Sequence, residues 1–384
     1  MSQTLAVLGS TGSIGVQALA IAEREPERVR VVALAAGSNL DQLVTQARRW
    51  QPAQVALESA RDLEAARARL CAAAPGATVQ LGPGAAARLS ADCGSEVVLN
   101  GIVGAAGLEA SLAALERGAR LALANKETLV VGGDLVRRAL ARSGELIPVD
   151  SEHSAAFQCL AGRPNSEVAR LVLTASGGAL RDHPDWRRAS PAEVLAHPVW
   201  SMGRRITVDS ALLVNKAFEL IEARWLFDLE WHQLEAWLHP QAIVHALVTF
   251  TDGSTVAQAA RPDMRLPIQL ALSWPSRWGE AAAPLTAHEL SALSFEPLVA
   301  GRWPAYDLAL AAGRAGGTAP CVLNAADEEA VAMFLAGRMT LAQVPQVLER
   351  VMQAHRTQPV ESLSQLRELD AWARAEARAV EVRS

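Results

Sequence analysis

The stretch that decides the fold lies near the N-terminus and reads Leu5-Ala6-Val7-Leu8-Gly9-Ser10-Thr11-Gly12-Ser13-Ile14-Gly15-Val16-Gln17-Ala18-Leu19-Ala20. A short apolar run leads into a turn with three glycines, and a segment of helical composition follows. This order places backbone N–H groups and a helix N-terminus where they can bind a pyrophosphate. The spacing G-x-x-G-x-x-G differs from the usual G-x-G-x-x-G, so a tight turn without a ligand is the alternative. The stretch predicts a Rossmann-like dinucleotide-binding domain.

Short apolar runs alternate with amphipathic segments over the first 150 residues, the pattern of strand-helix units around a parallel sheet. The candidate strands are residues 5–8, 29–35, 54–57, 96–99, 120–124 and 146–149. We expect an α/β protein made of a Rossmann-like NADPH-binding domain with a parallel sheet (1–150), an α/β catalytic domain with a mixed sheet (151–280), a linker (281–304) and a C-terminal helical bundle (305–384).

Local patterns support this division. Asp209-Ser210 is a good helix start by its capping chemistry, and a helix is predicted over residues 211–227. The turn dipeptide Asp252-Gly253 separates two apolar runs, residues 243–250 and 255–259, and predicts an antiparallel hairpin. Helical periodicity then dominates and predicts helices over residues 307–315, 325–337, 341–355 and 362–380.

Composition excludes several classes of protein. The 384 residues carry a formal net charge of -5 without long runs of one sign, so we expect no nucleic-acid or membrane partner. The sequence goes from Met1 almost directly into an apolar run, which favours a cytoplasmic protein. The cysteines are widely spaced without a CxxC pair, and we expect all of them to be reduced core residues: Cys71, Cys93, Cys159 and Cys321.

Lysine is unusually rare in this chain. Of the 36 basic residues only Lys126 and Lys216 are lysines. An ammonium is a compact donor, whereas guanidinium is a wide planar fork that would not fit the same pocket. Chance is the alternative, but the neighbours of both lysines are rich in polar groups. We therefore expect both lysines in an active site.

The end of the second predicted strand indicates which nicotinamide cofactor is used. NAD enzymes usually place an acidic residue there for the ribose hydroxyl, and this carboxylate would repel a 2′-phosphate. Here the segment reads Ala36-Gly37-Ser38-Asn39, without an acid. This favours NADPH.

Two acidic segments suggest a metal site. In Pro148-Val149-Asp150-Ser151-Glu152-His153-Ser154, an extended chain would turn Asp150 and Glu152 toward one point. Carboxylate oxygens suit Mg²⁺ or Mn²⁺ better than zinc. A solvated acidic turn is the alternative. Farther along, Glu219 follows Asn215 by four residues and Lys216 by three, so on a helix a third carboxylate neighbours both.

Two further segments complete the candidate site. Thr174-Ala175-Ser176-Gly177-Gly178 offers a hydroxyl and flexible backbone donors for a phosphate. The segment from His197 to Arg204 combines a titratable ring, an indole and a glycine, as a lid over a polar site does. We expect His153 and His245 to be hydrogen-bonded structural residues.

Taken in chain order, seven segments resemble the 1-deoxy-D-xylulose 5-phosphate reductoisomerase family, and the resemblance covers nearly the whole chain. They are LGSTGSIG (8–15), LANKETLV (123–130), PVDSEHSA (148–155), TASGG (174–178), HPVWSMGRRITVDSALLVNKAFE (197–219), HPQAIVH (239–245) and DGSTVAQAARPDMRLPI (252–268).

The resemblance implies an NADPH-dependent oxidoreductase, active with Mg²⁺, Mn²⁺ or Co²⁺, that rearranges and reduces 1-deoxy-D-xylulose 5-phosphate to 2-C-methyl-D-erythritol 4-phosphate in non-mevalonate isoprenoid biosynthesis. It also implies a homodimer. Catalytic roles fall to Lys126, Asp150, Glu152, His197 and Glu219. The implied metal ligands are Asp150, Glu152 and Glu219. The implied substrate contacts are Lys126, Ser151, Glu152, Ser176, His197, Trp200, Ser210, Asn215, Lys216 and Glu219. The implied NADPH contacts are Thr11, Gly12, Ser13, Ile14, Gly37, Ser38, Asn39, Asn125, Glu127 and Gly203.

The sequence departs from the family in two places. Many members have a basic residue at the position of Ser38, and Ala217-Phe218 stands where Gly and Leu are frequent.

Two other functions use the same nucleotide loop. An ordinary NADP-dependent dehydrogenase would keep its activity in EDTA, and a catalytically silent NADPH sensor would not need Asp150 and Glu219. The sequence leaves open whether the rearrangement follows a retro-aldol/aldol or an α-ketol route.

Overall fold

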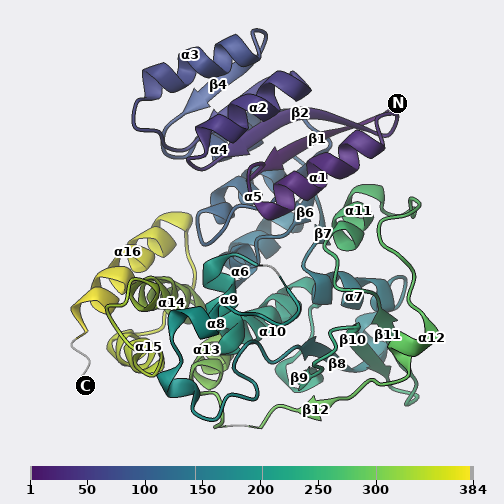
Figure 1. Cartoon of the computed structure of the whole chain (residues 1–384), viewed down its shortest axis with the longest axis vertical. Coiled ribbons are helices and arrows are strands. Elements are labelled where there is room, and N and C mark those ends of the chain that lie inside the picture. The colour runs from purple at the N-terminus through teal and green to yellow at the C-terminus, as the bar shows by residue number, and fades with distance from the viewer. Residues whose placement is uncertain (1, 143, 201, 300, 381–384) are drawn as a thin grey trace. The chain divides into compact units, whose positions relative to one another are not determined.

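The computed structural model describes residues 2–142, 144–200, 202–299 and 301–380 (Figure 1). The chain divides into two compact units. Unit 1 comprises Met1–Thr128, Leu135–Asp150 and Asp263–Ala282, and unit 2 comprises Leu129–Asp134, Ser151–Pro262 and Ala283–Ser384. The α/β class with a parallel sheet, a mixed sheet and C-terminal helices is confirmed. The domain boundaries at residues 150, 280 and 304 stay predictions.

Unit 1 is a doubly wound α/β fold. Its sheet has seven parallel strands in the order β4-β3-β2-β1-β5-β6-β7. The strands are β1 (Gln3–Leu8), β2 (Val29–Ala36), β3 (Gln54–Leu57), β4 (Thr78–Leu81), β5 (Val97–Asn100), β6 (Arg120–Leu123) and β7 (Glu145–Pro148). The helices are α1 (Ser13–Arg24), α2 (Leu40–Trp50), α3 (Leu63–Ala73), α4 (Ala85–Asp92), α5 (Gly107–Glu116), α6 (Glu127–Leu140) and α11 (Arg265–Ser273), with Leu129–Asp134 of α6 counted in unit 2.

Strand β1 is the switch point of this sheet. It pairs with β2 on one side and with β5 on the other, and Leu5 to Leu8 are fully buried. In open parallel sheets, ligands bind beyond the carboxyl ends of the strands at such a point. Gly9 follows immediately with φ +76°, and a Cβ there would lie 2.6 Å from the Gly101 carbonyl oxygen. Only glycine fits this turn.

The six predicted strands are present, with ends that differ by at most two residues from the prediction, but β4 was not predicted. This short edge strand is largely exposed or half-buried and lacks the apolar run that marks the others. The expectation for the cysteines is partly wrong. Cys159 and Cys321 are buried, whereas Cys93 is half-buried and Cys71 is exposed on α3.

Unit 2 combines a mixed sheet with helices. The sheet order is β11-β10-β8-β9-β12, in which only β8 and β9 run parallel. The strands are β8 (Val168–Ala175), β9 (Leu234–Leu238), β10 (Val244–Phe250), β11 (Thr255–Ala259) and β12 (Glu296–Pro297). The predicted hairpin is therefore confirmed, with Gly253 at φ +87° in its turn. The helices are α7 (Ser151–Leu160), α8 (Pro191–Val194), α9 (Arg204–Ala211), α10 (Val214–Phe227), α12 (Ala287–Leu290), α13 (Pro304–Ala315), α14 (Ala319–Leu335), α15 (Gln343–Ala354) and α16 (Leu363–Ala379).

The prediction of one helix starting at Asp209-Ser210 is wrong. Helix α9 already begins at Arg204, the chain breaks at Leu213 with φ +59°, and α10 starts at Val214. The left-handed region is unfavourable for a bulky side chain. Leu213 is buried, and its packing in the core offsets this cost. The break places Asn215 and Lys216 in the first turn of α10.

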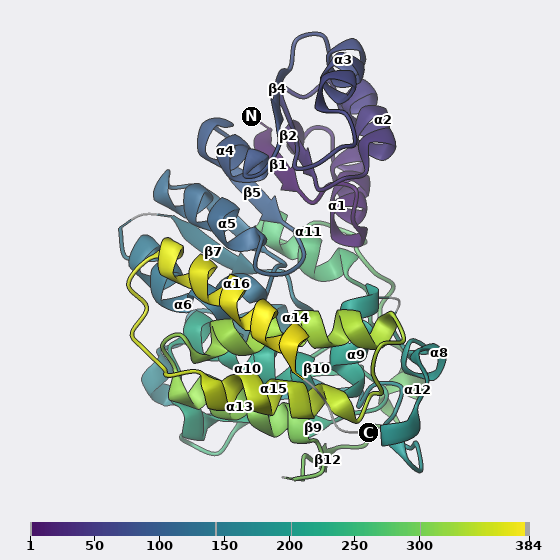
Figure 2. The same ribbon diagram turned by 90° about the vertical axis from the view of Figure 1, so that its left-hand side faces the viewer.

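The C-terminal helices α13 to α16 lie side by side (Figure 2). Buried apolar side chains from α14 and α15, including Val322, Leu323 and Leu348, join those of α10 and the mixed sheet in one core of unit 2. This core buries the apolar face of α10 and fixes its direction.

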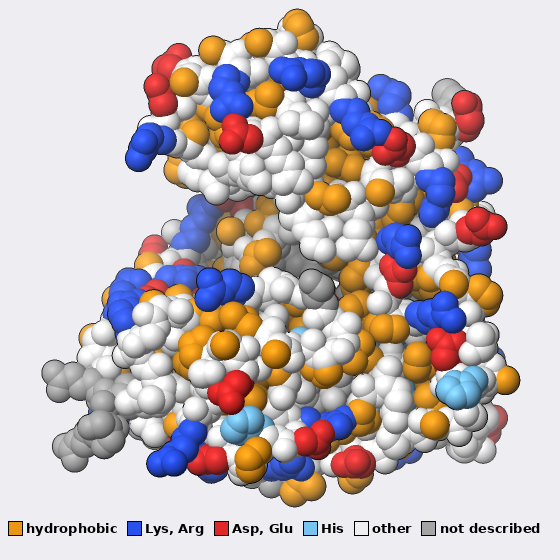
Figure 3. Space-filling view, viewed as in Figure 1, with side chains coloured by type: hydrophobic (Ala, Val, Ile, Leu, Met, Phe, Trp, Pro, Cys, Tyr) orange, Lys and Arg blue, Asp and Glu red, His pale blue; other side chains and the backbone are white. Residues whose placement is uncertain are grey.

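Charged side chains of both signs are interspersed on the face drawn in Figure 3. This fits the small net charge of -5. Among the described residues, no helix combines the length and apolarity needed to cross a membrane.

Candidate active site

The glycine-rich turn of unit 1 joins β1 to α1. Gly12 is the N-cap of α1, and among the described residues no side chain caps this end of the helix. A Cβ on Gly15 would lie 2.4 Å from the Gly9 carbonyl oxygen, which packs the helix start closely on the turn. Thr11, Gly12, Ser13 and Ile14 are exposed or half-buried there. The uncapped N–H groups suit an anion.

The turn after β2 holds the residues expected at the cofactor ribose. Gly37, Ser38 and Asn39 are all exposed. Asn39 caps α2, with its side-chain oxygen accepting from the Gln42 backbone N–H at 3.2 Å. Ser38 does not cap the helix, so its exposed hydroxyl can contact a ligand.

Asn125, at the end of β6, is nearly fully buried and orders the neighbouring loop. Its amide donates to the carbonyl oxygens of Ile102 at 2.8 Å and Gly104 at 2.9 Å, and to Glu127 Oε2 at 2.9 Å. Its oxygen accepts from the Thr128 N–H at 3.0 Å. Asn125 and Glu127 therefore hold the strand-to-helix junction that carries Lys126.

Lys126 stands between β6 and α6. Its Nζ lies 2.7 Å from Asp150 Oδ2, and the two side chains are 11% and 12% exposed. This ion pair stands at the carboxyl edge of the parallel sheet, since Lys126 follows β6 and Asp150 follows β7. The lysine is held in place and still reaches solvent.

The extended chain predicted from Asp150 to Glu152 is wrong. Strand β7 ends at Pro148, and Glu152 lies in the first turn of α7 rather than in extended chain. The alternation of side chains along a strand, which the prediction assumed, therefore does not set the direction of the Glu152 side chain. Ser151 donates from Oγ to Glu152 Oε2 at 2.5 Å.

Glu152, Lys216 and Glu219 meet within unit 2. Lys216 Nζ donates to Glu152 Oε1 at 3.0 Å and also to Glu219 Oε2. The other oxygen of Glu219 accepts from the Asn215 side-chain amide. The predicted helical neighbourhood of Asn215, Lys216 and Glu219 is therefore present, and α7 adds Glu152 to it.

Burial and charge act in opposite directions on Lys216. Burial disfavours the ammonium, but the carboxylates of Glu152 and Glu219 outweigh burial and raise the pKa of Lys216. The ammonium is therefore charged at neutral pH. It joins α7 to α10, and the first turn of α10 adds the positive end of a helix dipole.

The loop after β8 approaches the end of α9. Gly178 has φ +66°, and a Cβ there would lie 2.6 Å from the Ser210 carbonyl oxygen. This close contact brings the Thr174–Gly178 segment beside Ser210. Ser176 and Ser210 are both half-buried. Two of the hydroxyls predicted for a phosphate therefore come from adjoining segments.

His197 is held by hydrogen bonds on both ring nitrogens. Nδ1 faces the backbone N–H groups of Val199 at 3.1 Å and Trp200 at 2.9 Å, so it acts as acceptor. The neutral ring then carries its proton on Nε2, which lies 3.1 Å from Ser176 Oγ. Burial lowers the pKa of His197. The ring is neutral at pH 7 and leaves the Ser176 proton available for a ligand.

Two residues of the segment predicted to form a lid are placed by their contacts. The Trp200 ring lies 6.3 Å from the His245 ring, and Gly203 caps α9 on its exposed side. Ser201 lies outside the described residues. His153 and His245 are buried and bonded to backbone carbonyls of Glu219 and Ala260, as expected of structural residues.

Two features of unit 2 were not predicted, a buried glutamate and a cluster of ion pairs between α9 and α14. Glu222, one turn after Glu219, is fully buried, with Oε2 3.4 Å from His153 Nδ1. Arg205 on α9 reaches Asp327 at 3.2 Å and Glu328 at 2.8 Å on α14. Burial raises the pKa of Asp327 to about 6 against the opposing effect of Arg205. Only the helical spacing of Glu222 could have been found from sequence.

Comparisons with known proteins agree with this geometry. The family model described as 1-deoxy-D-xylulose 5-phosphate reductoisomerase matches residues 5–133, and two models of the C-terminal domains of these enzymes match residues 146–227 and 260–376. The reductoisomerase of Moorella thermoacetica is 47% identical over 388 residues, covering 99% of this chain and 98% of the relative. That of Gloeobacter violaceus is 48% identical, covering 97% and 96%.

Solved structures give the same result. The 1-deoxy-D-xylulose 5-phosphate reductoisomerase of Zymomonas mobilis in complex with NADPH superposes with a TM-score of 0.91 at 35% identity, covering 99% of both chains. A DOX-P reductoisomerase in complex with NADPH, fosmidomycin and magnesium superposes with a TM-score of 0.92 at 36% identity, covering 98% of both chains.

Proposed function

The chain belongs to the 1-deoxy-D-xylulose 5-phosphate reductoisomerase family, and from this membership we propose how its residues convert 1-deoxy-D-xylulose 5-phosphate to 2-C-methyl-D-erythritol 4-phosphate. The enzyme is an NADPH- and metal-dependent oxidoreductase of non-mevalonate isoprenoid synthesis. The observation that carries the proposal is the pair of carboxylates, Glu152 and Glu219, that face the Lys216 ammonium.

The bound groups bring the chemistry that side chains lack: NADPH supplies the hydride, and a divalent cation polarises neighbouring oxygens of the substrate. We assign Asp150, Glu152 and Glu219 as ligands of the cation. Oxygens of Glu152 and Glu219 lie within 4.8 Å of each other, and Asp150 precedes Glu152 by two residues. An all-carboxylate donor set fits Mg²⁺, Mn²⁺ or Co²⁺.

Lys126 acts at the reacting oxygens. Its ammonium is held by Asp150 at 2.7 Å and reaches solvent, so it can donate to an oxygen on which negative charge develops. Ser151 and Glu152, at the start of α7, contact the substrate hydroxyls. In this assignment Asp150 orients the ammonium of Lys126.

The substrate phosphate is bound by Ser176, Ser210, Asn215 and Lys216. Two hydroxyls, an amide and an ammonium supply donors for the phosphate, and the first turn of α10 adds the positive end of its dipole. His197 donates to Ser176 Oγ and thereby orients the hydroxyl proton outward. Trp200, three residues farther on, covers the substrate as part of the lid.

NADPH is bound by the turn after β1, the turn after β2 and the start of α6. The uncapped N–H groups of α1, with Thr11, Gly12, Ser13 and Ile14, take the pyrophosphate. The 2′-phosphate is bound by Gly37, Ser38 and Asn39. Asn125, Glu127 and Gly203 complete the contacts, and Asn125 also orders the loop beside them.

We further propose a homodimer in the cytoplasm. Support for the homodimer comes from β11, an exposed edge strand of the mixed sheet on which Val256 is 39% exposed (Figure 1). An unpaired edge of this kind can pair with a second copy. The four free cysteines fit a reducing compartment. Light scattering of the purified protein tests the dimer.

The decisive assay follows NADPH oxidation with 1-deoxy-D-xylulose 5-phosphate, with and without EDTA. We expect oxidation that EDTA abolishes and that Mg²⁺ or Mn²⁺ restores. Activity that survives EDTA would instead indicate an ordinary dehydrogenase, and cofactor binding without turnover would indicate a silent sensor. Glu219→Gln should lose the metal response in the same assay, whereas Glu230→Gln, an exposed glutamate after α10, should keep it.

A further inference from the structure

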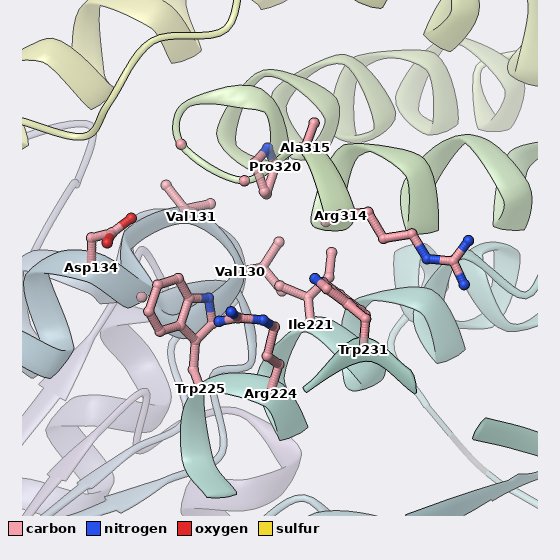
Figure 4. Close-up of a pocket in the computed structure, with 14 residues that line it drawn as sticks. Val130, Val131, Asp134, Ile221, Arg224, Trp225, Trp231, Arg314, Ala315 and Pro320 are labelled. Carbon is pink, nitrogen blue, oxygen red and sulfur yellow. The ribbon is translucent and has the colours of Figure 1, made fainter. Parts of the chain in front are cut away.

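Unit 2 contains a cavity that none of the residues proposed for the active site lines, as far as the described residues extend. It measures about 280 Å³ and lies between α6, α10 and the turn from α13 to α14 (Figure 4). Val130, Val131, Ile221 and Pro320 form its apolar wall. The exposed residue Ala315 stands at its rim, so the cavity opens to solvent. The volume lies just below the usual range for small-molecule sites.

Arg224 is the central charged group of this cavity. Its guanidinium carbon lies 5.5 Å from the Trp225 ring centroid and 5.9 Å from that of Trp231. Its Nε is buried and forms no hydrogen bond within the described part of the chain. Among the described residues, no carboxylate forms an ion pair with Arg224. A guanidinium held between two indoles without a counter-ion is a poorly satisfied cation.

The two indoles lie where glycines leave room for them. A Cβ on Gly133 of α6 would lie 2.3 Å from the Trp225 ring, and one on Gly313 of α13 would lie 2.9 Å from Trp231. Both ring positions therefore depend on a missing side chain on the facing helix. This arrangement fixes the guanidinium before any ligand arrives, which lowers the entropy cost of binding.

Two other charged residues line the cavity. Figure 4 shows the Arg314 guanidinium directed away from Arg224. Asp134 lies at the other end of the cavity and has an interaction partner of its own. Neither provides Arg224 with a counter-ion.

We infer that this cavity binds a small organic anion, a carboxylate or phosphate carried on a short apolar body. The oxyanion pairs with the terminal N–H groups of the Arg224 guanidinium, because Nε itself is buried and the side chain as a whole is only half-buried. The apolar body lies against Val130, Val131 and Ile221. The site is separate from the phosphate position at Lys216, although both stand on α10.

The test is calorimetric titration of the full-length protein with phenyl phosphate, benzoate, inorganic phosphate and phenol. Saturating 1-deoxy-D-xylulose 5-phosphate, without NADPH, is present to occupy the active site. We expect phenyl phosphate or benzoate to bind, with the tighter of them identifying the anion. Phenol lacks the charge and inorganic phosphate lacks the apolar body, so both should bind about tenfold more weakly or not at all.

Variants localise the binding. Arg224→Gln should weaken it by about tenfold or more, since it removes the charged fork. The matched control Arg314→Gln should stay within about threefold, because its guanidinium points elsewhere. Ala315→Trp at the exposed rim should block binding without disturbing the core, and thermal melting checks that each variant is folded. Absence of binding to wild type, or equal losses in Arg224→Gln and Arg314→Gln, would overturn the inference.

Discussion

The two lysines of this chain stand in opposite kinds of surroundings. Lys126 pairs with the carboxylate of Asp150, and both side chains are about a tenth exposed, at 11% and 12%. Lys216 pairs with two carboxylates, Glu152 and Glu219, and its side chain is only 4% exposed. Two carboxylates face the more deeply buried lysine, and their charge offsets the cost of removing its ammonium from water.

The difference separates two kinds of work. A partly exposed lysine can donate to a substrate oxygen while it keeps its charge. A buried lysine with two partners joins α7 to α10 and fixes the carboxylates as well as itself. Lys126 is thus suited to the reacting atoms, and Lys216 to holding a phosphate and a metal site together.

The largest effect is expected from Lys126→Arg. The wider guanidinium can keep the pair with Asp150 but cannot place one donor at the same point, so kcat should fall by about a thousandfold. The KM for 1-deoxy-D-xylulose 5-phosphate should change by less than about threefold. Steady-state kinetics with saturating NADPH and Mg²⁺ measure both. A rise in KM equal to the fall in kcat would contradict the division of labour.

The next effect concerns stability, and Lys216→Met tests it. The substitution leaves Glu152 and Glu219 as two like charges in a buried place, so the free energy of unfolding should fall by about 3 kcal/mol at pH 8. Chemical denaturation in EDTA measures this loss. It should shrink as the pH falls, because protonation neutralises the remaining carboxylates. Lys126→Met is the matched control and should cost less, since the side chains of its pair are more exposed than that of Lys216.

Added Mg²⁺ sharpens the same comparison. If Glu152 and Glu219 bind the cation, Mg²⁺ should raise the stability of Lys216→Met more than that of wild type, since it replaces the lost ammonium. Equal stabilisation of both proteins would show that Mg²⁺ does not bind at the carboxylates that pair with Lys216.

Much of the fold could be predicted because its signals are local. The apolar run from Leu5 to Leu8 and the Gly9 turn decide the first strand-helix unit, and the same alternation recurs up to β7. The break at Leu213 gave no such signal. Ala211, Leu212 and Val214 form an apolar run around it without Gly or Pro, so only the packing of α9 and α10 in the core explains the left-handed residue.

The site shows the same limit. The chemistry of Asp150 and Glu152 followed from residue type, but the geometry did not, because Ser151 starts a helix where an extended chain was expected. Arg205 and Asp327 are 122 residues apart in the chain. No local pattern joins them, and only the folded core of unit 2 brings α9 to α14.

A further prediction concerns the phosphate. Lys216→Arg keeps the charge between Glu152 and Glu219 but replaces a compact ammonium by a larger fork in a buried space. We expect KM for the substrate to rise by about tenfold, with kcat within about threefold of wild type. Inhibition by inorganic phosphate should weaken in parallel, which distinguishes a lost phosphate contact from a general disturbance of the fold. A fall in kcat as large as that of Lys126→Arg would remove the contrast between the two lysines.

The smallest effect comes from His197, whose role lies on the phosphate side of the comparison. Because burial lowers its folded-state pKa, the unfolded chain takes up the proton first as the pH falls below about 6.5. The neutral ring therefore contributes stability that is present above pH 6.5 and is lost as the pH falls toward the folded-state pKa. Protonation of Nδ1 would also break its bonds with the Val199 and Trp200 N–H groups and loosen the lid. We expect KM for the substrate to rise below pH 6.5, and His197→Asn to show a higher KM that changes about threefold less over the same range. An unchanged pH dependence in His197→Asn would show that another group, such as the substrate phosphate itself, controls binding.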